Sequence, residues 1–77
     1  MKAYREPIEV TPSRGQPIAI RWRHRTYRVE KILDFWIAQN KWWDREEKRI
    51  YLLLQTDHST MEVYRVGNSW TLSRLVD

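Results

Sequence analysis

Apolar and polar side chains alternate with a period of two from Ile18 onward, and this pattern constrains most of the chain to β-structure. Ile18, Ile20 and Trp22 alternate with small or basic residues, and Tyr27 and Val29 resume the alternation after a short break. A period of two places every second side chain on the same face of a strand, whereas a helix needs a period near 3.6. These residues therefore predict a hairpin of two half-buried strands.

The position of the turn decides which residues face each other in this hairpin. A two-residue turn at positions 24–25 would pair Trp22 with Tyr27 and Arg21 with Arg28. The sequence His-Arg lacks the glycine or asparagine that such turns prefer, so a longer loop with the same parity is the alternative. Either arrangement gives the aromatic pair one face and the arginine pair the other.

Residues 30–38, with the sequence EKILDFWIA, fit two structures. Their apolar side chains suit a doubly buried strand or a short helix, and periodicity alone does not separate the two. We favour a bent strand that continues from Val29, with one short helical turn near 30–40 as the alternative. The polar residues 39–48 are expected to form a loop.

The last 30 residues contain three β-rich runs, RIYLLLQT, TMEVYRV and SWTLSRLV, separated by DHS and by a Gly-Asn hairpin signal. With these turns, Leu54, Val63 and Leu72 line up across the three strands, and apolar side chains also occur on the reverse face. A curled sheet needs apolar residues on both faces. We therefore predict a mainly β fold, a five- to six-stranded antiparallel meander that forms a small SH3-like barrel or half-barrel.

Proline and glycine divide the chain into two unequal parts. All three prolines and one of the two glycines lie in the first 17 residues. Residues 1–16 are therefore expected to form an extended N-terminal arm, with a short edge strand at PIEV as an option, and residues 17–77 a single small β domain. Trp22 and Trp36 are expected in its core, and Trp70 beside Arg65 as a cation–π pair.

Several classes of function find no support in the residues. The chain has no cysteine, and its two histidines, His24 and His58, occur in no ligand-spacing motif, so we expect neither a metal nor a cofactor. No catalytic triad or glycine-rich phosphate loop can be assembled, which argues against an enzyme. The chain also lacks a signal peptide and an apolar run of about 20 residues, so we expect a cytoplasmic protein without a membrane partner.

The basic charge of the chain is concentrated in the stretch RWRHRTYR at residues 21–28. The chain has 14 basic and 10 acidic residues, and without the four arginines of this stretch it would be neutral. A local excess of arginine favours an anionic partner, because the guanidinium fork suits phosphate and stacks on bases. The predicted nucleic-acid-binding residues are Arg21, Arg23, Arg25, Arg28 and Lys31. The alternative is a surface ion-pair network with Glu6, Glu9, Glu30 or Asp34.

A tryptophan pair, Trp42 and Trp43, is the second candidate site. Tryptophan anchors protein interfaces and provides a stacking platform for single-stranded bases, although in a small protein it is more often part of the core. The leading hypothesis is a non-enzymatic nucleic-acid-binding module in which one of these tryptophans stacks or docks. The alternative is a protein-interaction adaptor that binds its partner through an exposed tryptophan edge.

The order of these motifs resembles a family of small bacterial proteins of unknown function. Members show W-R-x-R-x-Y-x-V-x-x-(I/L)-L-x-x-W, a tryptophan pair, a variable acidic or proline-rich insertion and a final W-x-L-x-R. The matching positions are Trp22, Arg23, Arg25, Tyr27, Val29, Leu33, Trp36, Trp42, Trp43, Trp70, Leu72 and Arg74. Two features depart from the pattern: His24 stands where glycine is usual, and the insertion is nearly absent.

The resemblance supplies a context rather than an activity. Genes of the family are often found near those of error-prone Y-family polymerases, which implies an accessory role in DNA repair or damage tolerance. The expected partner is therefore a nucleic acid, DNA more than RNA, or a DNA-repair protein.

Overall fold

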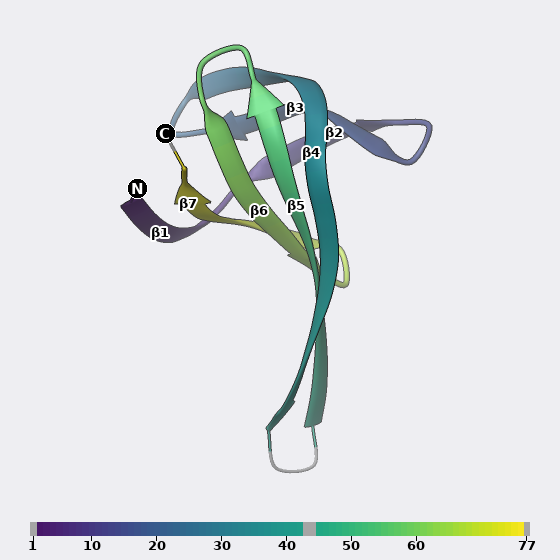
Figure 1. Cartoon of the computed structure of the whole chain (residues 1–77). Coiled ribbons are helices and arrows are strands. Elements are labelled where there is room, and N and C mark those ends of the chain that lie inside the picture. Colours follow the sequence, from purple (N-terminus) through teal and green to yellow (C-terminus); the bar gives the residue numbers. More distant parts are fainter. Residues whose placement is uncertain (1, 43–44, 77) are drawn as a thin grey trace.

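A computed structural model describes residues 2–42 and 45–76, in which seven antiparallel strands form one curled sheet (Figure 1). The strands are β1 (Lys2–Pro7), β2 (Glu9–Ser13), β3 (Gln16–Trp22), β4 (Arg25–Trp42), β5 (Arg45–Thr56), β6 (Thr60–Val66) and β7 (Ser69–Leu75). They lie in the order β1-β7-β6-β5-β4-β3-β2. The predicted mainly β, barrel-like meander is confirmed, with seven strands instead of five to six.

The N-terminal segment connects the two ends of this strand order. β1 pairs with β7 and β2 pairs with β3, although Ile8 alone separates β1 from β2 in the sequence. The backbone N–H of Ile8 donates to the carbonyl of Trp70 at 3.2 Å, which holds this junction against β7. Residues 2–13, within the segment expected to form an extended arm, therefore lie inside the sheet and curl it towards a barrel.

β4 is long because two bulges allow it to bend. Its first four residues pair with β3, and after irregularities at 29–31 and 32–34 the rest of the strand pairs with β5. An extra residue in one strand bends it and increases its twist. The bent-strand interpretation of residues 30–38 is confirmed, and the helical alternative is not.

The expected loop at 39–48 is wrong, because β4 continues to Trp42 and β5 begins at Arg45. The β4–β5 hairpin extends well past the other strands (Figure 1). A two-stranded ribbon exposes both of its faces, so polar residues fit it as well as they fit a loop. Polarity alone is therefore a poor guide to structure in this segment.

The β3–β4 turn lies one residue earlier than predicted. Arg23 and His24 form it with φ of 52° and 65°, and the observed register pairs Trp22 with Arg25 and Ile20 with Tyr27. Two successive residues at positive φ give a turn whose twist matches that of the strands, and this geometry prevailed over the poor turn chemistry. The register differs by two residues in total, so the predicted faces are preserved.

The β6–β7 hairpin has the predicted register, whereas the β5–β6 hairpin is shifted by two residues. Val66 pairs with Ser69 and Val63 with Leu72, as the Gly-Asn turn predicts. Leu52 stands opposite Val63, and the predicted partner Leu54 is wrong by two residues. The longer β5–β6 loop, in which the Thr56 side chain bonds the Ser59 carbonyl at 2.7 Å, fixes this register.

The core lies inside the curl of the sheet. Its buried residues are Ile20, Trp22, Tyr27, Leu52, Leu54, Met61, Val63 and Leu72. Trp22, with 6% of its surface exposed, is buried as predicted. Trp36 is only half-buried, which corrects its assignment to the core. The bulge before Asp34 inserts one residue, so Phe35 takes the core side of β4 and Trp36 the outer side, where it stacks on Tyr51 at 5.3 Å.

Candidate nucleic-acid interface

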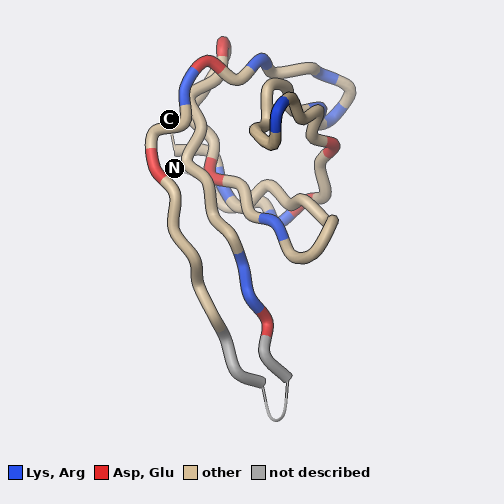
Figure 2. The backbone as a smooth tube through the Cα atoms, turned by 90° about the vertical axis from the view of Figure 1, so that its right-hand side faces the viewer, with Lys and Arg blue, Asp and Glu red and all other residues tan. Residues whose placement is uncertain are grey.

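The five predicted basic residues all lie on the β3–β4 hairpin or just after it, and all five are exposed. Arg21 belongs to β3, Arg23 to the turn, and Arg25, Arg28 and Lys31 to β4. Figure 2 shows Lys and Arg positions spaced along the arc of chain farthest from the tip of the β4–β5 hairpin, with acidic positions between them. The structure therefore brings the predicted residues to one end of the molecule.

Arg23 is held by an acidic residue from β1. Its Nε donates to Oε1 of Glu6 at 3.0 Å and its Nη2 to Oε2, while the indole N–H of Trp22 donates to the same Oε1 at 3.0 Å. The guanidinium also lies over the rings of Trp22 and Tyr4, 4.8 and 5.1 Å from their centroids. This part of the predicted basic patch is an ion-pair network.

The contact between Arg23 and Glu6 shifts the pKa of both groups. The hydrogen bonds from Arg23 and then Trp22 lower the pKa of the Glu6 carboxyl. The same contact with Glu6 raises the pKa of the Arg23 guanidinium. Both groups therefore remain charged over a wider pH range than they would alone, and the positive charge of Arg23 is locally neutralised.

Arg21 and Arg28 share the outward face of the hairpin, but they do not oppose each other directly. Arg21 faces Thr26 across the ladder and Arg28 faces Ala19. The predicted head-on pair is therefore wrong, and the two arginines are diagonal neighbours about 7–8 Å apart. Their mutual repulsion is correspondingly weaker.

An acidic residue lies near each of these two arginines, but neither acid binds the guanidinium. Glu9 of β2 stands opposite Arg21 in the register, and no ion pair joins the two side chains. Asp57, in the β5–β6 loop, binds the backbone of Arg28: its Oδ1 accepts from the Arg28 N–H and its own N–H donates to the Arg28 carbonyl, both at 3.0 Å. Asp57 thus positions β4 and leaves the Arg28 side chain exposed.

Three other arginines of the described chain have side-chain partners. Arg49 bonds Glu47 at 2.9 Å, and Arg74 bonds the buried Glu62 at 3.0 Å. Arg65 lies 5.7 Å from the ring centroid of Trp70, which confirms the predicted cation–π pair. In contrast, the structure gives no side-chain partner, among the residues it describes, to four predicted site residues: Arg21, Arg25, Arg28 and Lys31.

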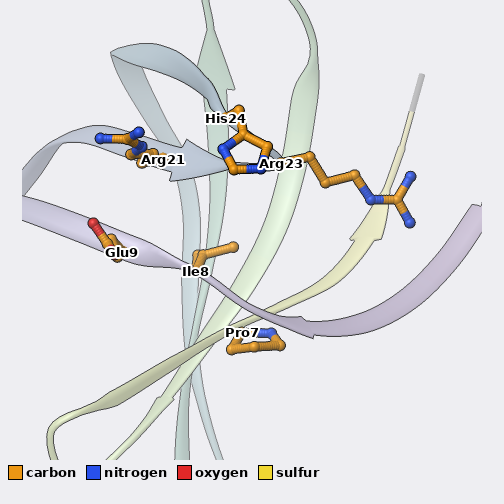
Figure 3. Close-up of a pocket in the computed structure, with 6 residues that line it drawn as sticks. All are labelled: Pro7, Ile8, Glu9, Arg21, Arg23 and His24. Atoms are coloured by element: carbon orange, nitrogen blue, oxygen red, sulfur yellow. The ribbon is translucent and has the colours of Figure 1, made fainter.

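An open groove of about 500 Å³ lies beside the hairpin, between the β1–β2 junction and the end of β3. Its lining residues are Pro7, Ile8, Glu9, Arg21, Arg23 and His24. Figure 3 shows the guanidinium groups of Arg21 and Arg23 pointing in opposite directions, with His24 between them and Glu9 below Arg21. The groove thus presents one free guanidinium and one imidazole towards solvent.

Sequence reasoning missed His24 and Asp57 as parts of this site. His24 was predicted as a turn residue and it lies in the turn, but it was not predicted to line the site. Asp57 is 29 positions from Arg28, and nothing local connects the two. Glu6 was among the acids considered, and the structure identifies it as the one that neutralises Arg23.

Only part of the second candidate site belongs to the described residues. Trp42 is the last residue of β4, but its side chain and the whole of Trp43 lie outside the described residues.

Within the described part, the structure contains no cluster of three His, Asp or Glu side chains suited to a metal ion. It also contains no helix, over residues 2–42 and 45–76, of the length and apolarity that crossing a membrane requires.

Comparisons of this chain with protein-family models, with curated proteins and with solved structures return no match. The resemblance drawn from the tryptophan and arginine motifs therefore stays a prediction.

Proposed function

We propose that this protein is a non-enzymatic nucleic-acid-binding module that contacts phosphates through Arg21, Arg25, Arg28 and Lys31. The observation that carries this proposal is the contrast between paired and unpaired cations. Arg23, Arg49 and Arg74 each bind a carboxylate, whereas these four cations lie together on the β3–β4 hairpin and bind no carboxylate of residues 2–42 and 45–76. A cluster of free cations lowers the free energy of an adjacent polyanion more than the same charges would if scattered.

In this proposal Arg23 is a positioning residue. Its bonds to Glu6 tie the β3–β4 turn to β1, so the turn cannot fold over the neighbouring arginines. The backbone contacts of Asp57 do the same for β4 at Arg28. Rigid supports reduce the entropy lost when the free side chains bind a ligand.

The proposed ligand is DNA more than RNA, and the proposed context is DNA repair or damage tolerance in the cytoplasm. Both follow from the family resemblance. The free arginines support a phosphate contact of either polymer, because phosphate contacts position a protein without reading sequence.

The test is a titration of labelled single- and double-stranded oligonucleotides at several salt concentrations. Replacing Arg21 and Arg28 with glutamine should reduce affinity about tenfold or more at moderate salt and lower the slope of log affinity against log salt by about two, near one per lost phosphate contact. The thermal midpoint should stay the same, since neither guanidinium has a side-chain partner among the residues that the structure describes.

A matched control removes the same charge elsewhere. Arg14, in the turn at the start of β3, and Lys48, on β5, are exposed, and neither belongs to the 21–31 stretch that carries the four free cations. Their double replacement with glutamine should change the salt slope by less than half as much. Equal effects of the two pairs would show that net charge alone, and not this site, drives binding. Salt-insensitive binding, or none at low salt, would favour the adaptor hypothesis instead.

A further inference from the structure

The β4–β5 hairpin continues past the strands that flank it. β6 pairs with β5 only from Ile50 to Gln55, and β3 pairs with β4 only from Arg25 to Arg28. The distal hairpin is therefore a two-stranded ribbon, visible in Figure 1 as the long extension of β4 and β5. A two-stranded ribbon in water is only marginally stable, whereas three or more strands with an apolar face are stable.

Apolar side chains are exposed where this ribbon leaves the barrel. Phe35 and Ile37 have 56% and 50% of their surface exposed, the two highest values among the large apolar residues of the described chain. Both point to the core side of β4, and they stand opposite Leu52 and Ile50 of β5. The apolar face of the barrel thus continues onto the ribbon without a cover.

The two free edges of the ribbon differ in charge. β5 lacks a second neighbour only at 45–49, which reads REEKR with a charge at every position. β4 lacks β3 beyond Arg28, and its edge at 35–39 reads FWIAQ with no charge, between Asp34 and Lys41. Charged side chains are the usual means by which a free strand avoids pairing with another chain. The β5 edge is therefore protected, and the β4 edge is open to another strand.

We propose that the β4 edge pairs with the β4 edge of a second copy of this chain, antiparallel, around a two-fold axis at Ile37. In this register Ile37 faces Ile37 of the second copy, and Trp36 faces its Ala38. Side chains on the same face of each ribbon then meet, as an antiparallel ladder requires. The two ribbons together form a four-stranded sheet.

Self-pairing is favoured over another partner because this segment complements itself. The large Trp36 meets the small Ala38 on the outer face, and Ile37 meets an identical apolar side chain on the inner face. Asp34 is the one charge between positions 32 and 38, and in this register it does not meet a second acid. Such an interface is isologous and uses both open edges at once, so the assembly stops at a dimer.

The row of aromatic rings on the outer face supports the same position. Trp36 stacks on Tyr51 with an angle of 2° between the rings, and Tyr51 lies 5.2 Å from Tyr64. Arg49 covers Tyr64 at 4.8 Å. The row therefore ends at Trp36, at the open edge, where the second copy would add its own row.

Sedimentation equilibrium over chain concentrations up to about 1 mM tests the proposal, since a dimer whose Kd lies well below 1 mM is mostly associated at that concentration. The unmodified chain should be a dimer. Ile37→Lys should weaken dimerisation at least about 100-fold, because it removes two apolar side chains from the contact and places two like charges face to face. Ile18→Lys, at an apolar residue 45% exposed on β3, is the matched control and should remain dimeric. A monomeric unmodified chain, or a dimeric Ile37→Lys variant, would overturn the proposal.

A second measurement locates the axis. Because the chain has no cysteine, Ile37→Cys introduces a single thiol at the proposed two-fold position. Under mild oxidation this variant should form disulfide-linked dimers much faster than Ile18→Cys, since directly opposed residues meet the distance that a disulfide requires. Equal rates for the two variants would place the contact elsewhere and contradict the proposed register.

Discussion

Glu6 in β1 and Arg23 in the β3–β4 turn, 17 positions apart in sequence, form a two-point ion pair that also engages the indole N–H of Trp22. This contact joins the first strand of the sheet to the hairpin that carries the free arginines. Arg23 therefore has a structural role, whereas the other arginines of the hairpin are available for a ligand. This difference in role can be tested.

The stability of the protein should depend on pH through Glu6. Because its folded-state pKa lies below its ordinary value of 4.5, Glu6 contributes stability that is present above that value and lost as pH falls through the folded-state pKa. Glu6→Gln should therefore have a lower thermal midpoint than the unmodified protein at pH 7, and the difference should disappear in acid. Glu9→Gln, at the opposite side of the Ile8 junction, is the control. A difference that persists below the folded-state pKa would contradict the ion pair.

Replacement of Arg23 should affect stability, whereas replacement of Arg25, two positions later, should affect binding. Arg23→Gln removes the contacts with Glu6 and should lower the thermal midpoint with little change in the salt slope of oligonucleotide binding. Arg25→Gln should leave the thermal midpoint unchanged and lower that slope by about one. The opposite pattern would mean that the assignment of structural and binding arginines is reversed.

The two tryptophans expected in the core should now respond differently to truncation. Trp22→Ala should cost about 3–5 kcal/mol, enough to unfold much of a small domain. Trp36→Ala should cost about 1–2 kcal/mol, because Trp36 is half-buried and loses mainly its stacking on Tyr51. Urea denaturation of both variants provides the comparison, and equal losses would place Trp36 in the core after all.

The buried carboxylate of Glu62 should make Arg74 costly to replace. Arg74→Met leaves Glu62, 6% exposed, without its guanidinium. We expect a loss of about 2–3 kcal/mol, less than for a fully buried pair because the Arg74 side chain is 41% exposed. Adding Glu62→Gln to Arg74→Met should restore part of that stability. A double variant less stable than Arg74→Met would show that the carboxylate itself is needed.

Glycine at position 24 should stabilise the β3–β4 turn. His24 has φ of 65°, a conformation that costs a residue with a side chain about 1–2 kcal/mol. Glycine removes this cost, but it loses more conformational entropy on folding, which offsets part of the stabilisation. The net stabilisation of His24→Gly should be about 0.5–1 kcal/mol by urea denaturation. Val76→Gly, at an exposed residue beyond β7, should not stabilise.

Periodicity in the sequence predicted the faces of the strands better than their registers. The alternation from Ile18 to Val29 and the Gly67-Asn68 turn placed most core residues correctly. The predicted registers of the β3–β4 and β5–β6 pairs were each wrong by two residues. The position of a turn depends on its backbone geometry, and the residues of these two turns do not indicate that geometry. The burial of Trp36 was wrong for a related reason, since a bulge shifts the alternation and local sequence does not reveal it.

The candidate site was predictable in composition but not in its division of roles. The concentration of arginine at 21–28 located the hairpin. Which arginine binds an acid depends on Glu6, which reaches Arg23 only through the pairing of β1 with β7 at the far end of the sequence. Long-range pairing of this kind has no local signature.

The pairing of Lys2 with Leu75 also governs when the protein can fold. β1 finds its place only beside β7, so during synthesis the curled sheet must stay open until residues 71–75 have left the ribosome. Contacts between the two ends of a chain form slowly, because loop closure costs entropy before any contact compensates for it. During this interval Trp22 can already contact its core neighbours on β3 and β4. The β1–β7 pair that later buries these residues has not yet formed.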